Sequence, residues 1–205
     1  MPDDSQEIKR GRKFEQVLEG AREIFLKDGF DGASVDDIAK AAGVSKATLY
    51  SYFPDKRLLF MEVARNECAV QADTATAKVN VSLPARDVLR FAGYEMINIM
   101  SQTFNTRMYR MCMAESERFP EVGRQFYECG PALVRSRIVY FLKQYVERGE
   151  LKIQDFELAA DQFQALCKVE LMDRVMFLHE VPVAEADKAR VVEGAVEMFM
   201  ARYGA

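Results

Sequence analysis

A dense group of hydrogen-bond donors lies between positions 45 and 56 of this 205-residue chain. Hydroxyl and ammonium groups suit the phosphate oxygens of a nucleic acid, and a lysine can also donate to the O6 and N7 atoms of guanine. Lys46 has that second option, and the methyl group of Ala47 could contact the methyl group of thymine. The polar members of the group are Ser45, Lys46, Thr48, Tyr50, Ser51, Tyr52 and Lys56. These residue types predict contacts with DNA.

Two short helices joined by a glycine turn would position these donors. Ser34 is a good N-cap for the first helix, and Asp37 three residues later can close a capping box. Gly43 supplies the positive φ that ends this helix, and Ser45 caps the second one. The apolar residues that would hold the pair together are Val35, Ile38, Ala39, Ala42, Val44, Leu49 and Phe53. Such a helix-turn-helix presents its second helix to the major groove of DNA.

The stretch DDIAKAAGVSKATLYSYFPDKRLL resembles the DNA-binding signature of TetR-type transcriptional regulators. A long helix with an apolar stripe precedes the motif in that family, and residues 14–29 have the same pattern here. The resemblance implies that Thr48, Tyr50 and Lys56 touch DNA and that Ser34 contacts a phosphate. Tyr52 occupies a position whose role varies within the family.

Base recognition by this motif is expected to be modest. Some members of the family read bases with an arginine two residues after the position of Ser34, whereas Asp36 stands there in this chain and would repel DNA. Phosphate positioning and groove shape would then carry much of the selectivity. Alternatives stay open for three residues, because Tyr50 and Tyr52 could pack in the core and Lys46 could be an idle surface charge.

The charge balance confines any nucleic-acid surface to local patches. The chain has 28 Lys and Arg against 32 Asp and Glu, a net charge of −4. Basic side chains nevertheless gather before and within the motif, at Lys9, Arg10, Arg12 and Lys13 and at Lys40, Lys46, Lys56 and Arg57. The polar first residues argue against a signal peptide, and no run of about 18 apolar residues could span a membrane. We therefore expect a cytoplasmic protein.

Catalytic and metal-binding patterns are absent from the sequence. Cys68, Cys112, Cys129 and Cys167 lie far apart without a C-x-x-C pair, and His179 is the single histidine. The cysteines suit a reducing compartment as small buried hydrophobes, with a redox-sensing role as the alternative. No nucleophile–base pair accompanies the histidine, so an enzyme is the weakest interpretation. We expect no metal and no cofactor.

The apolar periodicity predicts an all-α fold of nine helices, or ten if Gly130-Pro131 breaks one of them. Residues 1–54 would form a three-helix helix-turn-helix domain, and residues 55–205 a helical bundle for ligand sensing and dimerisation. The last two helices are expected at about 155–179 and 185–203, separated by Val181-Pro182.

A two-fold dimer is expected, because one DNA-binding unit of this size makes too few contacts for useful specificity. TetR-type dimers pair their last two helices into a four-helix bundle, and the resemblance implies the same arrangement here. The candidate interface residues are Phe163, Leu166, Val192, Val196, Phe199 and Met200. The alternative for this stripe is an ordinary intramolecular core.

The central helices carry the candidate sensor. AESERFPEVGRQFYECGP, YFLKQYVERGELKIQD and ELAADQFQAL are similar to the C-terminal region of the AefR-like branch of TetR regulators, which does not settle what is sensed. Methionine and aromatic side chains suit an adaptable apolar pocket, although they suit a core equally well. The candidate pocket residues are Phe91, Tyr94, Glu95, Met96, Met100, Met108, Met111, Phe126 and Tyr127. Glu95 would receive a donor from the ligand or pair with an arginine such as Arg110.

These observations predict a dimeric DNA-binding regulator, a repressor that a small apolar or amphipathic effector releases from a near-palindromic operator. The alternative is a DNA-bound protein-interaction factor without a small-molecule ligand. A cavity among the central helices would favour the first interpretation, and a fully packed core with an exposed patch would favour the second.

Overall fold

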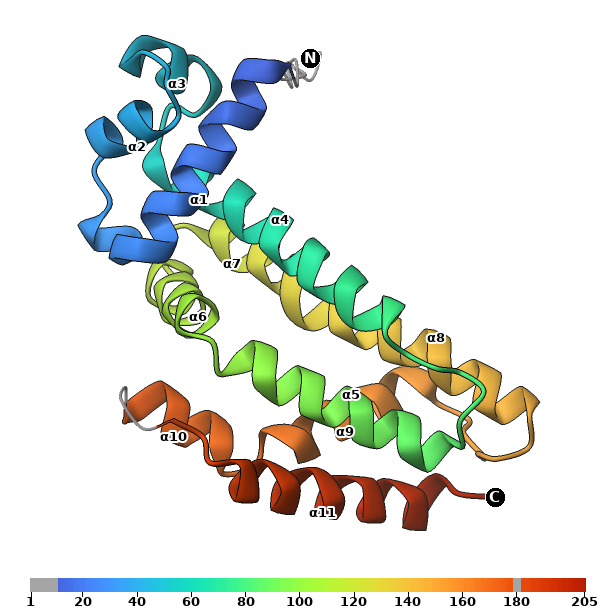
Figure 1. Cartoon of the computed structure of the whole chain (residues 1–205). Helices are drawn as coiled ribbons and strands as arrows, with labels where there is room; N and C mark the ends of the chain where they lie inside the picture. The colour runs from blue at the N-terminus through green and yellow to red at the C-terminus, as the bar shows by residue number, and fades with distance from the viewer. Residues whose placement is uncertain (1–10, 179–181) are drawn as a thin grey trace.

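The computed structural model describes residues 11–178 and 182–205, and over these ranges the chain is almost entirely helical (Figure 1). The all-α prediction is therefore confirmed. Leu151 and Gly204 form an isolated antiparallel bridge. The helices are α1 (Arg12–Gly32), α2 (Val35–Ala41), α3 (Lys46–Tyr52), α4 (Lys56–Ala77), α5 (Ala85–Met100), α6 (Thr103–Glu115), α7 (Pro120–Tyr127), the π-helix η1 (Glu128–Ala132), α8 (Leu133–Glu147), α9 (Phe156–Lys168), α10 (Leu171–Phe177) and α11 (Glu185–Tyr203).

Some sequence predictions concern residues outside the described ranges. Lys9 and Arg10 of the first basic patch belong to this group, as do His179 and most of the segment on which the absence of a signal peptide was predicted. Within the described ranges, no helix is long and apolar enough to cross a membrane.

The helix-turn-helix forms as its capping residues predict. The side chains of Ser34 and Ser45 accept the amide hydrogens of Asp37 and Thr48 and so begin α2 and α3. Gly43 has a φ of +64°, which favours glycine at the turn between them. Helices α1, α2 and α3 lie together at one end of the molecule (Figure 1).

A second glycine sets the distance between α1 and α2. A Cβ atom added to Gly20 would lie 2.5 Å from the backbone nitrogen of Ala42, closer than van der Waals contact allows. Ala42 is itself buried at the end of α2. The Cα and Cβ atoms of Ala42 would lie nearly as close, at 2.7 and 2.8 Å. Because these atoms belong to backbone or to a buried methyl group, the close approach of the two helices requires glycine at this position.

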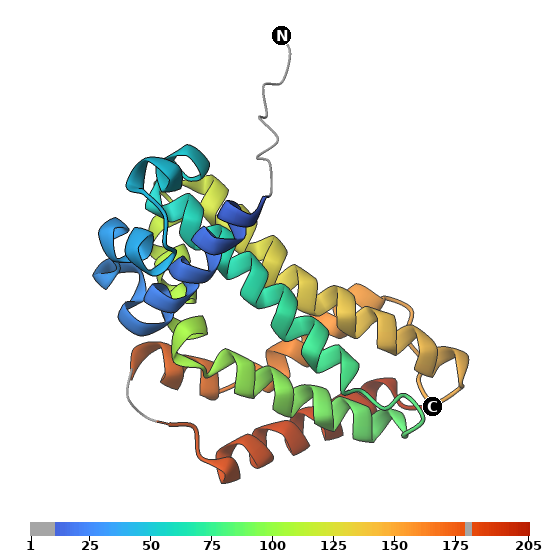
Figure 2. The same cartoon turned by 45° about the horizontal axis from the view of Figure 1, so that its top comes forward.

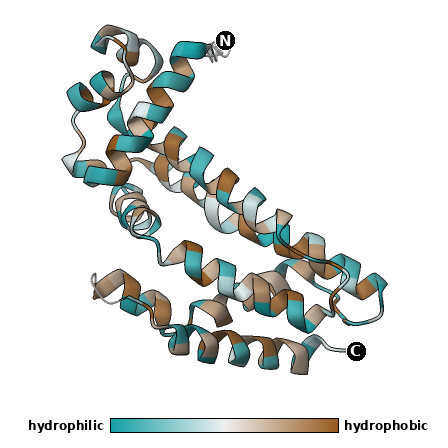
Figure 3. Ribbon diagram, viewed as in Figure 1, coloured by the Kyte–Doolittle hydropathy of each residue, from teal (hydrophilic) through white to brown (hydrophobic). Residues whose placement is uncertain are grey.

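Two hydrophobic clusters divide the interior. The first contains the apolar faces of α1–α3 and is completed by Phe60 and Val63 of α4, Met108 and Cys112 of α6 and Val122 of α7. The second lies among α5, α8, α9 and α11 and includes Ile97, Phe163 and Phe199. Brown and teal residues alternate along most helices in Figure 3, as expected when each helix turns one face towards a neighbour.

Helix α4 leads from the DNA-binding end into the rest of the molecule, and α8 runs beside it in both orientations (Figure 2). The division into domains at residue 54 stays a prediction. The first cluster crosses that position, because residues of α4, α6 and α7 pack against α1–α3.

Gly130-Pro131 does not break the chain into two helices separated by a loop, because the helical path continues through both residues. The π-helix η1 contains both residues and joins α7 to α8 without an intervening loop. A π turn can accommodate a proline that would remove a hydrogen bond from a regular α-helix.

The single helix predicted for residues 155–179 is wrong. It divides into α9 and α10 at Val169 and Glu170, and Glu170 has a φ of +64° without being a glycine.

We predict that Gly20→Ala destabilises the fold by about 2 kcal/mol, since overpacking a well-filled contact typically costs this much. Gly32→Ala is the matched control, because its added Cβ atom would lie 3.4 Å from the Asp28 side chain, an ordinary contact. Denaturant unfolding followed by circular dichroism measures both changes. Equal stabilities of the two variants would contradict the close approach.

Candidate nucleic-acid interface and effector cavity

The helix-turn-helix exposes only part of its donor set. Ala47 and Tyr50 are exposed on α3, and Tyr50 keeps 48% of its surface accessible to solvent. Leu49 and Phe53 are buried and point into the first cluster. Tyr52 is half-buried and its ring meets Phe14 edge-on, with centroids 5.7 Å apart. The core-packing alternative therefore describes the ring of Tyr52, whereas Tyr50 faces solvent.

Lys46 and Asp36 form an ion pair between α3 and α2. The sequence suggested that Asp36 would repel DNA and that Lys46 would be free to reach it. Both side chains are more than half exposed, so solvent screens the pair and it contributes little to stability. Its effect is to hold the ammonium of Lys46 at the N-terminus of α3 and to reduce the net positive charge there.

Lys56 is engaged inside the DNA-binding unit. Its Nζ donates to the carbonyl oxygens of Phe30 at 2.8 Å and Ala33 at 3.1 Å, and it lies 4.5 Å from the centre of the Phe30 ring. These contacts join the end of α1 to the start of α4. A DNA contact by Lys56 stays a prediction.

A second link fastens α4 to α7. Arg57 donates to the carboxylate of Asp55, the N-cap of α4, and these hydrogen bonds hold the pKa of Asp55 below its usual value. The guanidinium carbon of Arg57 also lies 3.4 Å from the centre of the Phe119 ring, immediately before α7. The start of α4 is thus held by charged contacts as well as by the first hydrophobic cluster.

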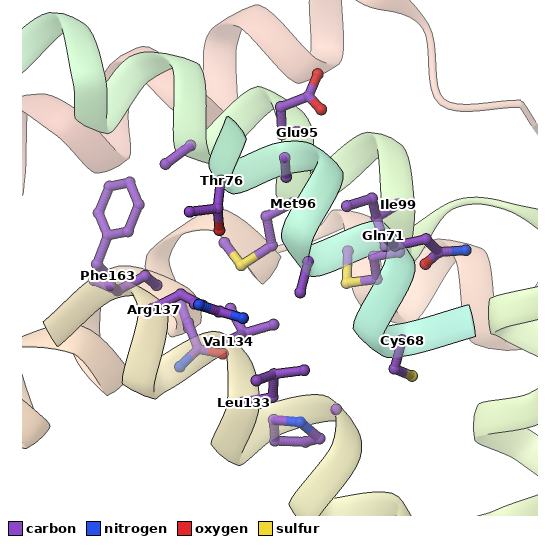
Figure 4. A pocket seen from close by; sticks show the side chains of 18 of the residues that line it. Cys68, Gln71, Thr76, Glu95, Met96, Ile99, Leu133, Val134, Arg137 and Phe163 are labelled. Atoms are coloured by element: carbon purple, nitrogen blue, oxygen red, sulfur yellow. The ribbon is translucent and has the colours of Figure 1, made fainter. Parts of the chain in front are cut away.

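A cavity of about 240 Å³ lies among the central helices (Figure 4). Its walls come from α4, α5, α6, α8, α9 and α10, together with Phe126 and the π-helix. Apolar side chains make up most of the lining, including the flexible Met96 and Met100. The volume and the lining suit an apolar body of small-molecule size.

Six of the nine predicted pocket residues line this cavity: Phe91, Glu95, Met96, Met100, Met108 and Phe126. Three do not, and helix direction explains each. Tyr94 packs against the second hydrophobic cluster and Met111 against the first. Tyr127 is on the outside of α7 and is half exposed.

Glu95 has an ion-pair partner, but a different one from that expected. Its Oε2 lies 3.1 Å from Nζ of Lys78, which follows α4. Arg110 instead donates to the backbone carbonyl of Val175 in α10. The salt bridge expected for Glu95 therefore forms across the α4–α5 connection.

Several polar cavity residues were missed by the sequence analysis. Arg137 of α8 and Lys168 of α9 both line the cavity, as does the buried Asn105 of α6. The Oδ1 atom of Asn105 and the Nε atom of Arg137 are buried without a hydrogen-bond partner among the described residues. No spacing rule would have found them, because they come from helices that meet only in the folded chain.

The four cysteines divide into two kinds. Cys112 and Cys167 are buried, and burial raises the pKa of each thiol to about 12. Cys68 and Cys129 both line the cavity, with their sulfur atoms 3.9 Å apart. This contact raises the pKa of Cys68 and lowers that of Cys129. No group of three or more metal-binding side chains occurs in the part of the chain that the structure describes.

The predicted dimer stripe needs correction. Phe163, Val192, Val196 and Phe199 are at most 1% exposed and pack inside the second hydrophobic cluster of a single chain. Leu166 and Met200 are partly buried against the same cluster. The intramolecular alternative therefore describes this stripe, because α5 and α9 cover the inner face of α11.

Two family models together match most of the chain. The model described as the AefR-like transcriptional repressor C-terminal domain matches residues 87–205, and that of the tetR family of bacterial regulatory proteins matches residues 17–63. AcnR of Corynebacterium efficiens, an HTH-type transcriptional repressor, is 37% identical over 62 residues, which is 30% of this chain and 33% of that protein. The chain thus spans about a third of the length of the curated relatives that it matches first.

Solved structures match over almost the whole chain. A TetR-family transcriptional regulator from Mesorhizobium loti has a TM-score of 0.83 and 26% identity, covering 95% of this chain and 98% of the other. The flavonoid-responsive regulator FrrA has a TM-score of 0.71 and 32% identity, with the same coverage. All of these relatives are described as transcriptional regulators, and none as an enzyme.

We predict that Lys46→Ala weakens binding to an operator by about 1–3 kcal/mol. If the ammonium reads guanine, the preference at one base pair relaxes, whereas a phosphate contact weakens binding to all sequences equally. Fluorescence anisotropy with a set of single-base operator variants separates these outcomes. Lys152→Ala removes an exposed lysine between α8 and α9, outside both basic patches, and is the control. Unchanged affinity in Lys46→Ala would mean that its ion pair with Asp36 excludes it from DNA.

Proposed function

Because the chain belongs to the TetR family of helix-turn-helix transcriptional regulators, with a C-terminal domain of the AefR-like type, we propose that it is a dimeric repressor released from its operator by a small molecule. The effector would be apolar or amphipathic and would occupy the cavity among the central helices. As a regulator of bacterial genes, the protein would work in the cytoplasm.

The observation that carries this proposal is the cavity beside α4. The helix begins at Lys56, four residues after the end of α3, and its far half lines the cavity from Cys68 to Thr76. A helix is stiff over this length, so a displacement at the cavity is transmitted to the recognition helix. The DNA-binding unit and the effector site therefore share one structural element.

DNA contacts would come from residues that the fold leaves accessible. Tyr50, Ala47 and Lys46 face solvent on α3, and the hydroxyls of Ser34, Ser45 and Thr48 lie at the exposed N-termini of α2 and α3. Helix N-termini favour phosphate groups because their amides and dipole point outward. Residues 1–54 would then serve DNA recognition, and residues 55–205 sensing and dimerisation.

Dimerisation would use the outer faces of α9 and α11. Their inner faces are buried in the monomer, whereas Leu158, Val169 and Met198 are 51%, 60% and 61% exposed. Leu158, Gln162 and Ala165 follow one another at helical spacing on α9, Val169 stands directly after the helix, and all four are exposed. On α11, Gly194, Met198 and Ala201 form a similar small and apolar stripe. Packing these stripes against a second copy would give a four-helix bundle.

The effector would act on the distance between the two recognition helices. A dimer reads half-sites about one turn of DNA apart, so a conformer with a different spacing loses the operator. A ligand can cause this change only if it prefers that conformer, by about 5.5 kcal/mol for a near-complete switch. The name of FrrA, a flavonoid-responsive regulator, supports a small-molecule effector for the present chain as well. The alternative without a ligand is disfavoured by the cavity.

The test of this proposal begins with selection of DNA sites on the purified protein, which should yield an inverted repeat. Flavonoids and medium-chain fatty acids are then screened for release of that DNA by fluorescence anisotropy. Ala92→Phe places a large side chain in the cavity and should abolish release while DNA binding persists. If the selection yields no DNA sequence, the proposal that this protein is a DNA-binding regulator is wrong. If Ala92→Phe leaves the release unchanged, the effector binds outside the cavity.

For the dimer, we predict that Met198→Asp gives a folded monomer, since a buried unpaired carboxylate costs about 3–5 kcal/mol. Phe199→Ala should instead destabilise each chain by about 3–5 kcal/mol through a core cavity. Light scattering after size exclusion reports the oligomeric state, and thermal melting reports stability. Val70→Asp is the control, because Val70 is equally exposed but lies on α4. A dimeric Met198→Asp variant would place the interface on other elements.

A further inference from the structure

Among the charged side chains that line the central cavity, cationic groups outnumber acidic ones. Glu95, Arg137 and Lys168 are the lining residues that carry formal charge. The remaining lining is mostly apolar, so few other groups could balance these charges. The partners of the three side chains therefore decide which charge on a ligand the cavity would accept.

The carboxylate of Glu95 already has a cationic partner within the chain. Its carboxylate accepts from Nζ of Lys78 at 3.1 Å, and 24% of the Glu95 side chain is exposed against 53% for Lys78. A cationic ligand would have to compete with that ammonium. The single acidic group of the lining thus gives little reason for a cation to bind.

Arg137 has a buried N–H donor without an acceptor on the side of the cavity. Its Nη2 donates to Asp73 of α4 at the more exposed end of the guanidinium, while its Nε is buried and lacks an acceptor among the described residues. Figure 4 shows this side chain reaching between Phe163 and Val134 into the cavity. A guanidinium carries five N–H donors in a fixed planar fork, a geometry that matches a carboxylate or another oxyanion.

Lys168 is a cation without a counter-ion. It is half-buried at the end of α9, and no carboxylate of the described residues lies within ion-pair distance of it. Asp161, the acidic group that acts on it from a distance, pairs with Arg135 instead. Burial lowers the pKa of the Lys168 ammonium, which means that the site penalises its charge. An anion placed nearby would remove this penalty.

We propose that the effector is an amphipathic anion, with an apolar body in the cavity and an oxyanion such as a carboxylate, sulfonate or phenolate held by Arg137 and Lys168. This inference rests on the proposed function, because it specifies the chemistry of the same site. The head group supplies an acceptor for Nε of Arg137 and a counter-ion for Lys168. The flexible methionines and the aromatic residues enclose the body.

Two fluorescent probes that differ by one charged group test the proposal. 1-Anilinonaphthalene-8-sulfonate carries a sulfonate, and N-phenyl-1-naphthylamine is the same skeleton without it. Titrated at constant ionic strength, the wild-type protein should bind the sulfonate more tightly. Lys168→Met and Arg137→Gln should each weaken sulfonate binding roughly tenfold, as expected for loss of a hydrogen bond to a charged group. Binding of the neutral probe should not change.

Two further variants complete the design. Lys143→Met removes an exposed lysine of α8 that does not line the cavity, and it should leave both affinities unchanged. Asp73→Asn removes the negative charge that competes for Arg137 and should tighten sulfonate binding several-fold. Circular dichroism checks that each variant is folded.

The outcomes separate this inference from the proposed function. Equal affinities of the wild-type protein for both probes, or equal losses in Lys168→Met and Lys143→Met, would overturn the anion preference while leaving an apolar effector cavity intact. If Ala92→Phe changes the binding of neither probe, the cavity is not their site, and the effector proposal fails together with the inference.

Discussion

Helix α4 packs against the helix-turn-helix with its first turns and lines the central cavity with its later turns. The rest of the structure depends on this division. Its first turns bury Leu59, Phe60 and Val63 in the hydrophobic cluster of the helix-turn-helix. From Cys68 to Ala77 it has no fully buried residue, and this half forms a wall of the central cavity. A rigid rod is thus tightly packed at the DNA-binding end and loosely packed at the other. Because filling the cavity would cost the protein few existing contacts, the proposed effector could shift this helix without unfolding it.

The start of α4 explains why its movement would reach the recognition helix. Lys56 binds the backbone at the end of α1, and Arg57 joins Asp55 to the ring of Phe119. Gly20 brings α2 against α1 within a distance that no larger residue would allow. These contacts bind α1, α2 and the start of α4 into one body. Leu49 of α3 is buried in the same cluster, so we expect the exposed side chains of α3 to move with α4.

Local signals in the sequence were reliable where the cause of the structure is local. Ser34 and Ser45 cap their helices and Gly43 takes a positive φ, because each effect involves atoms only a few residues apart. The break at Val169 and Glu170 escaped prediction, since neither residue is a glycine or proline, the residue types that usually mark such a break. The stripe containing Phe163 and Phe199 was recognised as apolar, but helical periodicity cannot tell an intramolecular partner from a second chain.

The sequence by itself determined the all-α class, the helix-turn-helix and a methionine-rich centre, because capping and apolar periodicity are properties of short segments. Tertiary structure decided which groups meet. It paired Lys46 with Asp36, turned Tyr52 towards Phe14 and gave Glu95 the partner Lys78. It also brought Arg137 and Lys168 to one cavity from two different helices. Pairings of this kind depend on helix crossing and burial across the whole chain, and these have no signature in the spacing of residues along it.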